Sequence, residues 1–219
     1  MNLNELDQYL ELILIDMDLH TCFHLEAVQT PPTKTLEQVK YALIDWYLHV
    51  LRTRKEILQR LTNYVFADAY FSKSTFVNGA LEMGFHVISR FRDDAYSQYL
   101  TTEQPKGKKG CPKLYDGKIE MKHLEEDRFE IINLENGQGR ILSAVVHSRS
   151  LSRDILLCIW GSEDKKVRKL YFATDTQMKA IDVLDFYKTR FQVEFCFKDS
   201  KQFTGLTNCQ SRDIDKLHF

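Results

Sequence analysis

The stretch FYKTRFQVEFCFKDSK, residues 186–201, is crowded with aromatic side chains, yet a phenol, two cations and a carboxylate run through it at steps of three, four and seven residues: Tyr187, Arg190, Glu194 and Lys201. We expect this stretch to be helical. An α-helix advances by about 100° per residue, so four polar side chains would fall within an arc of about 60°: Tyr187, Arg190, Glu194 and Lys201. Aromatic and aliphatic residues fall beside this arc, which predicts that one side of the helix packs against a sheet.

The polar face of this helix has two interpretations. Arg190 and Glu194 are four residues apart and could form an ordinary surface ion pair, worth roughly a few tenths of a kcal/mol. Alternatively, two cations and one acid on a single face suit the binding of a polyanion together with a divalent metal ion. The spacing alone leaves both interpretations open.

Composition limits the classes of protein that the chain can belong to. With 219 residues, 43% of them hydrophobic, it can bury a core as one domain with an insertion or as two small domains. The net charge is −1, so any nucleic-acid binding must depend on local basic patches. The five cysteines are scattered and odd in number, which indicates a reducing compartment and argues against a structural zinc or a disulfide framework. No apolar run could span a bilayer and no signal peptide begins the chain, so we expect a cytoplasmic protein.

The N-terminal part combines strand and helix periods. Residues 10–18 read as a buried strand and residues 22–28 alternate between apolar and polar, which together predict an antiparallel hairpin. Residues 35–61 change to a helical period and predict one amphipathic helix. Thr35 and Gln38 would form a capping box at its start.

An acidic residue interrupts the next apolar segment. Residues 63–71 predict a central strand that contains Asp68, followed by a short helix capped by Ser72 or Ser74 and by another strand at residues 85–91. An ionised carboxylate in a buried strand is costly unless it meets a cation or a metal ion. The alternative is an aspartate at the strand end that bonds the start of a nearby helix.

The composition changes near residue 101. Residues 104–118 contain glycine, proline and five lysines, which predicts a loop. Four short strands are expected to follow, at residues 128–134, 140–148, 154–160 and 166–174. Asp175 or Thr176 would then cap the last helix, which continues through Lys201.

Two separated blocks resemble one known family. The spacing Tyr-x2-Arg-x3-Glu-x6-Lys in residues 187–201 resembles the YREK signature of DDE transposases of the insertion-sequence-four type. Residues 65–95, VFADAYFSKSTFVNGALEMGFHVISRFRDDA, resemble the family segment built on the second catalytic aspartate, with an arginine closing the next strand. The order of predicted elements agrees with that family as well.

The resemblance implies an α/β fold. The expected architecture is a ribonuclease-H-like mixed sheet flanked by helices, with a β-rich insertion before the last catalytic helix. Residues 1–100 would form the N-terminal part of the catalytic core, without its first strand. Residues 101–173 would form the insertion, and residues 174–219 the catalytic helix and tail that complete the core.

The resemblance also implies the chemistry, which is metal-dependent phosphodiester cleavage and strand transfer at transposon ends. Asp68 and Glu194 match the second and third acids, which would hold Mg2+, or Mn2+ in its place, as a pair of ions about 3.5–4 Å apart. Tyr187, Arg190 and Lys201 match positions that bind phosphates of transposon-end DNA. The family works as a homodimer in a synaptic complex, with neither a membrane nor a small-molecule substrate. The lysine-rich loop could contact the DNA backbone or simply be solvated: Lys106, Lys108, Lys109 and Lys113.

The chain departs from the family pattern at the first catalytic aspartate. Asp16 ends the first recognisable strand but matches the family's second core strand, so it is a disfavoured candidate for the missing metal ligand. Asp7 lies where no strand is expected and is disfavoured further. We therefore expect a truncated and impaired transposase, also lacking the family's final helix. The alternative is a non-catalytic DNA-binding fragment that acts as an inhibitor or is simply a remnant. A metalloprotein using His20 and His24 is disfavoured, because residues four apart on a strand and turn do not share a face as they would on a helix.

Overall fold

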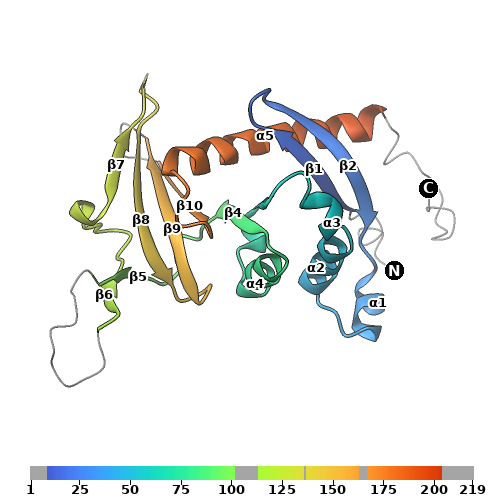
Figure 1. Ribbon diagram of the computed structural model, residues 1–219, viewed down its shortest axis with the longest axis horizontal. Coiled ribbons are helices and arrows are strands. Elements are labelled where there is room, and N and C mark those ends of the chain that lie inside the picture. Colours follow the sequence, from blue (N-terminus) through green and yellow to red (C-terminus); the bar gives the residue numbers. More distant parts are fainter. Residues whose placement is uncertain (1–8, 102–112, 136, 163–166, 204–219) are drawn as a thin grey trace. The chain divides into compact units, whose positions relative to one another are not determined.

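The computed structural model describes residues 9–101, 113–135, 137–162 and 167–203, and Figure 1 gives the order of its elements. The chain divides into two compact units. The smaller unit contains Met1–Val50 and Lys188–Phe219, and the larger contains Leu51–Tyr187.

The larger unit is built on one mixed sheet with the strand order β3-β4-β10-β9-β8-β5-β6, and β7 also pairs with β8. Its strands are β3 (Tyr64–Ala67), β4 (His86–Arg90), β5 (Ser97–Leu100), β6 (Tyr115–Lys118), β7 (Glu130–Asn133), β8 (Arg140–Ser148), β9 (Arg153–Gly161) and β10 (Arg168–Ala173). Only β3 and β4 pair in parallel, and the other pairs are antiparallel. The β-rich segment therefore continues the same sheet, because β10 pairs directly with β4.

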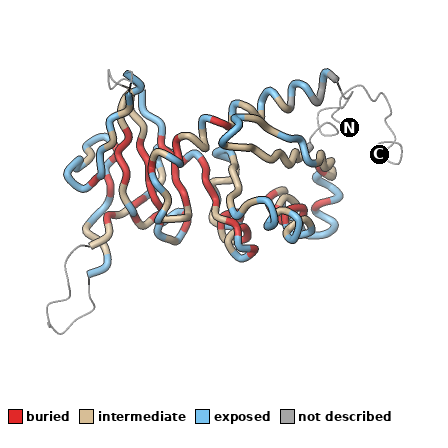
Figure 2. Tube along the Cα trace, turned by 45° about the horizontal axis from the view of Figure 1, so that its top comes forward, coloured by how far each residue is buried: buried red, intermediate tan, exposed pale blue. Residues whose placement is uncertain are grey.

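Helices cover the β4 region of this sheet. Parallel strands need a crossover, and α4 (Ser74–Glu82) makes it between β3 and β4 with a buried apolar stripe. The start of α5 (Ala180–Phe203) packs against a core cluster that includes Ile88, Leu156 and Tyr171. Neighbouring strand residues point to opposite faces of a sheet, so Val87 lies on the other face of β4 from Ile88. Val87 is also fully buried, so both faces of β4 are covered. The central strands are accordingly the most continuously buried part of the unit (Figure 2).

The predicted N-terminal hairpin is confirmed in the smaller unit. Strands β1 (Tyr9–Asp16) and β2 (Thr21–Gln29) pair antiparallel, with a register shift between Leu12 and Ile13. The Asp16 carboxylate closes the turn by accepting hydrogen bonds from the backbone N–H groups of Asp18 (3.0 Å) and Leu19 (2.9 Å). Asp16 thus has a local structural role in the hairpin.

The single helix expected over residues 35–61 is wrong. The segment forms three helices, α1 (Thr33–Gln38), α2 (Leu43–Thr53) and α3 (Lys55–Leu58). Lys40 adopts a left-handed conformation with φ 57°, which ends α1 because that backbone cannot continue a right-handed helix. The capping box of Thr35 and Gln38 does not form either, because α1 already begins after Pro32 and has no side-chain cap.

Three further boundaries differ from the sequence-based expectation. β3 ends at Ala67, and residues 69–71 form a short 3-10 helix, η2 (Ala69–Phe71). Neither expected serine caps α4, because Lys73 occupies the N-cap position without a side-chain hydrogen bond. α5 begins only at Ala180, so neither Asp175 nor Thr176 caps it. Asp175 instead accepts hydrogen bonds from the backbone N–H of Gln177 (3.0 Å) and from the Tyr64 hydroxyl (2.8 Å).

The fold class is confirmed, since the chain is a mixed α/β protein whose mixed sheet is flanked by helices in the ribonuclease-H-like manner. The four strands predicted after residue 120 all form, as β7 to β10, and they precede the long helix α5. A further short 3-10 helix, η3 (Glu126–Arg128), precedes β7. Among the helices of the described residues, none has the length and apolar character needed to cross a membrane.

Candidate active site

Asp68 lies directly after the last residue of β3, at the carboxyl end of a parallel strand. Its Oδ1 accepts a hydrogen bond from the backbone N–H of Tyr70 (2.8 Å), so the carboxylate caps η2. The carbonyl oxygen of Asp68 accepts a second hydrogen bond, from the hydroxyl of the buried Ser89 (2.9 Å). Asp68 is exposed and lies outside the strand, so the expected buried carboxylate within a strand is wrong and the alternative at the strand end is confirmed.

Arg90 and Tyr171 lie at the same edge of the sheet as Asp68, which is the edge formed by the carboxyl ends of β3 and β4. Ala67 pairs with Ser89 in the parallel register of β3 and β4, so the next positions along the two strands are Asp68 and Arg90. On the other side of β4, Arg90 pairs with Tyr171 of β10. Burial raises the pKa of Tyr171 to about 12, the neighbouring Tyr187 adds to this rise, and the Arg90 charge opposes it. The register therefore places Asp68 and Arg90 at neighbouring positions, with the buried Tyr171 opposite Arg90.

Tyr187 reaches this edge from α5. Its ring stacks at a tilt on Tyr171, with 4.4 Å between the centroids. The preceding Phe186 packs against Phe66, with 4.9 Å between the ring centroids. Because β3 and β10 both contribute rings to these contacts, they fix which side of the first turns of α5 faces the sheet. The larger unit thus brings Asp68 and Tyr187 to one region of its sheet.

Arg190 and Glu194 belong to the smaller unit and form an ion pair, with 3.2 Å between Arg190 Nη1 and Glu194 Oε1. Their side chains are 41% and 58% exposed, which is typical of a surface pair. The surface ion pair, one of the two interpretations of this face, is therefore present. Lys201 lies in the same helix, but its side chain is outside the described residues. The prediction that this stretch is helical is confirmed, because α5 runs without a break from Ala180 to Phe203.

The meeting of the two acids stays a prediction. Asp68 is in the larger unit and Glu194 in the smaller one, and each is placed only within its own unit. Within the part of the chain that the structure describes, no group of three or more histidine, cysteine or acidic side chains is arranged to hold a metal ion. His20 and His24 therefore belong to no such group among the described residues. The His24 Nε2 atom lies 3.9 Å from a carboxylate oxygen of Glu11.

The lysine-rich loop is only partly described. Lys106, Lys108 and Lys109 lie outside the described residues, and so does Asp7. Lys113 forms an ion pair with Asp116 (3.1 Å), and this hydrogen-bonded ammonium group lowers the pKa of the Asp116 carboxyl. A lysine held by a carboxylate has less charge available for a DNA phosphate.

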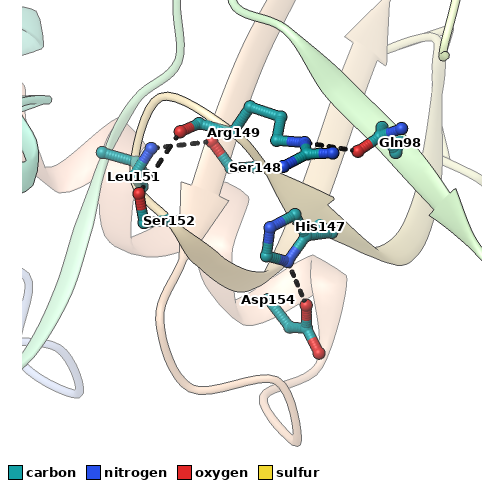
Figure 3. A network of polar contacts seen from close by, with 7 residues as sticks. All are labelled: Gln98, His147, Ser148, Arg149, Leu151, Ser152 and Asp154. Carbon is teal, nitrogen blue, oxygen red and sulfur yellow. Dashed lines mark hydrogen bonds and ion pairs between the residues drawn. The ribbon is translucent and has the colours of Figure 1, made fainter. Parts of the chain in front are cut away.

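A second polar network lies on β5, β8 and β9, and sequence reasoning did not identify it (Figure 3). Arg149 Nε donates a hydrogen bond to Gln98 Oε1 (2.6 Å), and His147 Nδ1 lies 2.8 Å from Asp154 Oδ1. The Tyr115 ring stacks at a tilt on His147, with 4.6 Å between the centroids. These contacts join side chains of neighbouring strands to one another. Only the cross-strand register, which pairs Gln98 with His147 and His147 with Asp154, could have indicated it.

Comparison with known proteins assigns the family. A family model described as the transposase DDE domain matches residues 33–219. No curated protein and no solved structure matches the chain. The matched region contains Asp68, the edge formed with Arg90 and Tyr187, and the ionic face of α5. The chain therefore belongs to the DDE transposase domain family.

Proposed function

We propose that this chain is the catalytic domain of a bacterial insertion-sequence transposase of the insertion-sequence-four type, acting on transposon-end DNA in the cytoplasm. The family match over residues 33–219 carries this proposal. In it, residues 1–100 and 174–219 form the catalytic core and residues 101–173 the insertion. The working form is a homodimer that holds two DNA ends.

Asp68 and Glu194 are the proposed metal ligands. Mg2+ prefers oxygen donors and keeps several of its waters, so exposed carboxylates fit it. Asp68 is exposed, and within the described residues only its Oδ1 is engaged in a hydrogen bond, which leaves Oδ2 open. When bound, Mg2+ or Mn2+ would activate the attacking oxygen and stabilise the leaving oxygen. Only these two acids are assigned, and two carboxylates hold metal weakly, so we propose an impaired active site.

Tyr187, Arg190 and Lys201 are the proposed phosphate-binding residues. Arginine and lysine bind phosphate through charge, and a phenol binds it through its hydroxyl. The Tyr187 ring is held by Tyr171, which supports a fixed position for that hydroxyl. Arg190 can exchange its partner Glu194 for a phosphate at little cost, because the ion pair is largely exposed. These three residues orient the DNA and supply no proton transfer.

The test is nicking of supercoiled plasmid DNA in the presence of Mn2+, together with calorimetric titration of the protein with Mn2+. We expect weak nicking and weak Mn2+ binding, both lost in Glu194→Gln. The control is Glu82→Gln, which removes an exposed carboxylate at the end of α4 and should change neither.

The second candidate function is a non-catalytic DNA-binding fragment that inhibits transposition. The Arg190–Glu194 ion pair favours it, because it gives Glu194 a structural partner. This candidate predicts DNA binding that is unchanged by Mn2+ and by Glu194→Gln. Robust nicking that depends on Asp68 would instead contradict the impaired active site.

A further inference from the structure

Two cysteines meet within the smaller unit, one from β2 and one from α5. The Cys22 thiol donates a hydrogen bond to the carbonyl oxygen of Gln192 (3.4 Å), and Gln192 precedes Cys196 by about one helical turn. Burial raises the pKa of the Cys196 thiol to about 11, and the neighbouring Cys22 thiol adds to this rise. Both residues are partly exposed free thiols. The hairpin therefore touches the helix at Cys22, and the Cys196 thiol lies beside this contact.

The side of α5 that faces the hairpin confirms this contact independently. Thr189, Gln192 and Cys196 are spaced by three and four residues, so they form one stripe on the helix. Thr189 donates from its hydroxyl to Met17 Sδ (3.6 Å), and Met17 follows β1 directly. Met17 and Cys22 flank the hairpin turn and both lie over this stripe. Cys196 thus points toward β2 because of the helix register as well as its thiol contact.

We propose that Cys22 and Cys196 form a reversible thiol–disulfide switch that ties the β1–β2 hairpin to α5. The oxidant is a low-molecular-weight disulfide. One cysteine attacks it and forms a mixed disulfide, releasing one thiol. The second cysteine then displaces the other thiol and completes the Cys22–Cys196 bond. Two protein thiols are oxidised and one small disulfide is reduced to two thiols, so atoms and electrons balance.

The location of the pair decides what the bond would do. A disulfide stabilises a protein mainly by restricting its unfolded chain, and more so when the closed loop is long. The Cys22–Cys196 loop encloses the whole of the larger unit, Leu51–Tyr187. The bond would also fix the hairpin against the helical segment that carries Arg190 and Glu194. By contrast, Cys158 is 1% exposed and takes no part, since a thiol in the core is out of reach of a soluble disulfide.

The experiment incubates the full chain with oxidised glutathione and maps its peptides without reduction by mass spectrometry. We expect a Cys22–Cys196 linked peptide, and a rise in melting temperature of about 5–10 °C that dithiothreitol reverses. Cys196→Ser should remove both the linked peptide and the rise, whereas the control Cys111→Ser should keep both.

Three results would overturn the switch. They are stable glutathione adducts on Cys22 or Cys196 without the linked peptide, a disulfide between two chains on a non-reducing gel, and a melting shift that persists in Cys196→Ser. The peptide map of the unsubstituted chain decides the question even if Cys196→Ser fails to fold. The switch does not depend on phosphoryl transfer, so a failed nicking assay leaves this outcome readable.

Discussion

Asp68 has two separable properties, a hydrogen-bond acceptor and a negative charge, and two substitutions distinguish them. Its Oδ1 caps η2 through the Tyr70 N–H (2.8 Å), and asparagine caps a helix about as well as aspartate does. Asp68→Asn should therefore keep the cap and lose only the charge. Asp68→Ala should lose both.

The structure sets the expected magnitudes. Replacing a capping aspartate by alanine costs about 0.5–2 kcal/mol, and the low end applies here because η2 has only three residues and Asp68 is exposed. We expect the free energy of unfolding to fall by about 0.5–1 kcal/mol in Asp68→Ala and to stay within about 0.3 kcal/mol of the original in Asp68→Asn. If the carboxylate binds metal, both variants should lose Mn2+ binding equally.

The assay is urea unfolding followed by circular dichroism, run beside calorimetric titration with Mn2+. Equal destabilisation of the two variants would refute the capping geometry. Unchanged Mn2+ binding in Asp68→Asn would refute the assignment of this carboxylate as a metal ligand. Since the two readouts are independent, either half of the reasoning can fail without the other.

Three further predictions concern the scaffold. Leu184→Ala should lower the free energy of unfolding by about 2–4 kcal/mol, because this side chain is 4% exposed in the core cluster under α5, and urea unfolding measures the loss. Lys40→Gly should raise the melting temperature by relieving a left-handed lysine after α1, whereas Lys34→Gly, inside α1, should lower it. Tyr64→Phe should cost about 1 kcal/mol at pH 7 by removing the hydroxyl that bonds Asp175. That hydroxyl lowers the pKa of the Asp175 carboxyl, so its contribution is present above about pH 4 and is lost as the pH falls through the folded pKa; acid unfolding of Tyr64→Phe should lack this component.

Much of the fold could be predicted because buried apolar residues recur every second position in a strand and every three to four positions in a helix. Residues 155–160 of the predicted strand are apolar, and residues 155–159 are all buried because β9 is covered on both faces. The two breaks in residues 35–61 were missed because the apolar period continues across both of them, past the left-handed Lys40 after α1 and past Arg54 between α2 and α3. Lysine carries no sequence signal for that conformation, unlike glycine or asparagine.

Sequence resemblance assigned the candidate acids Asp68 and Glu194, whose roles stay predictions, but it could not predict their surroundings. The contact of Tyr171 with Tyr187 depends on the register of β10 against β4, which residues far apart in the sequence determine. The bond of Asp175 to Tyr64 of β3 likewise joins residues far apart in the sequence. Local patterns cannot report such pairings, because each half of the contact looks ordinary by itself.

The Arg190–Glu194 ion pair does not by itself exclude Glu194 from metal binding. A pair between side chains that are 41% and 58% exposed is worth roughly 0.3–0.5 kcal/mol, less than a divalent ion or a phosphate gains from a charged ligand. A double-mutant cycle with Arg190→Ala and Glu194→Ala, measured by urea unfolding, should therefore give a coupling energy of at most about 0.5 kcal/mol. The same coupling should shrink in high salt, because exposed charges are screened. A salt-insensitive coupling above about 1.5 kcal/mol would mean that the pair is a structural element of α5, and Glu194 would then be held too firmly to serve as a ligand.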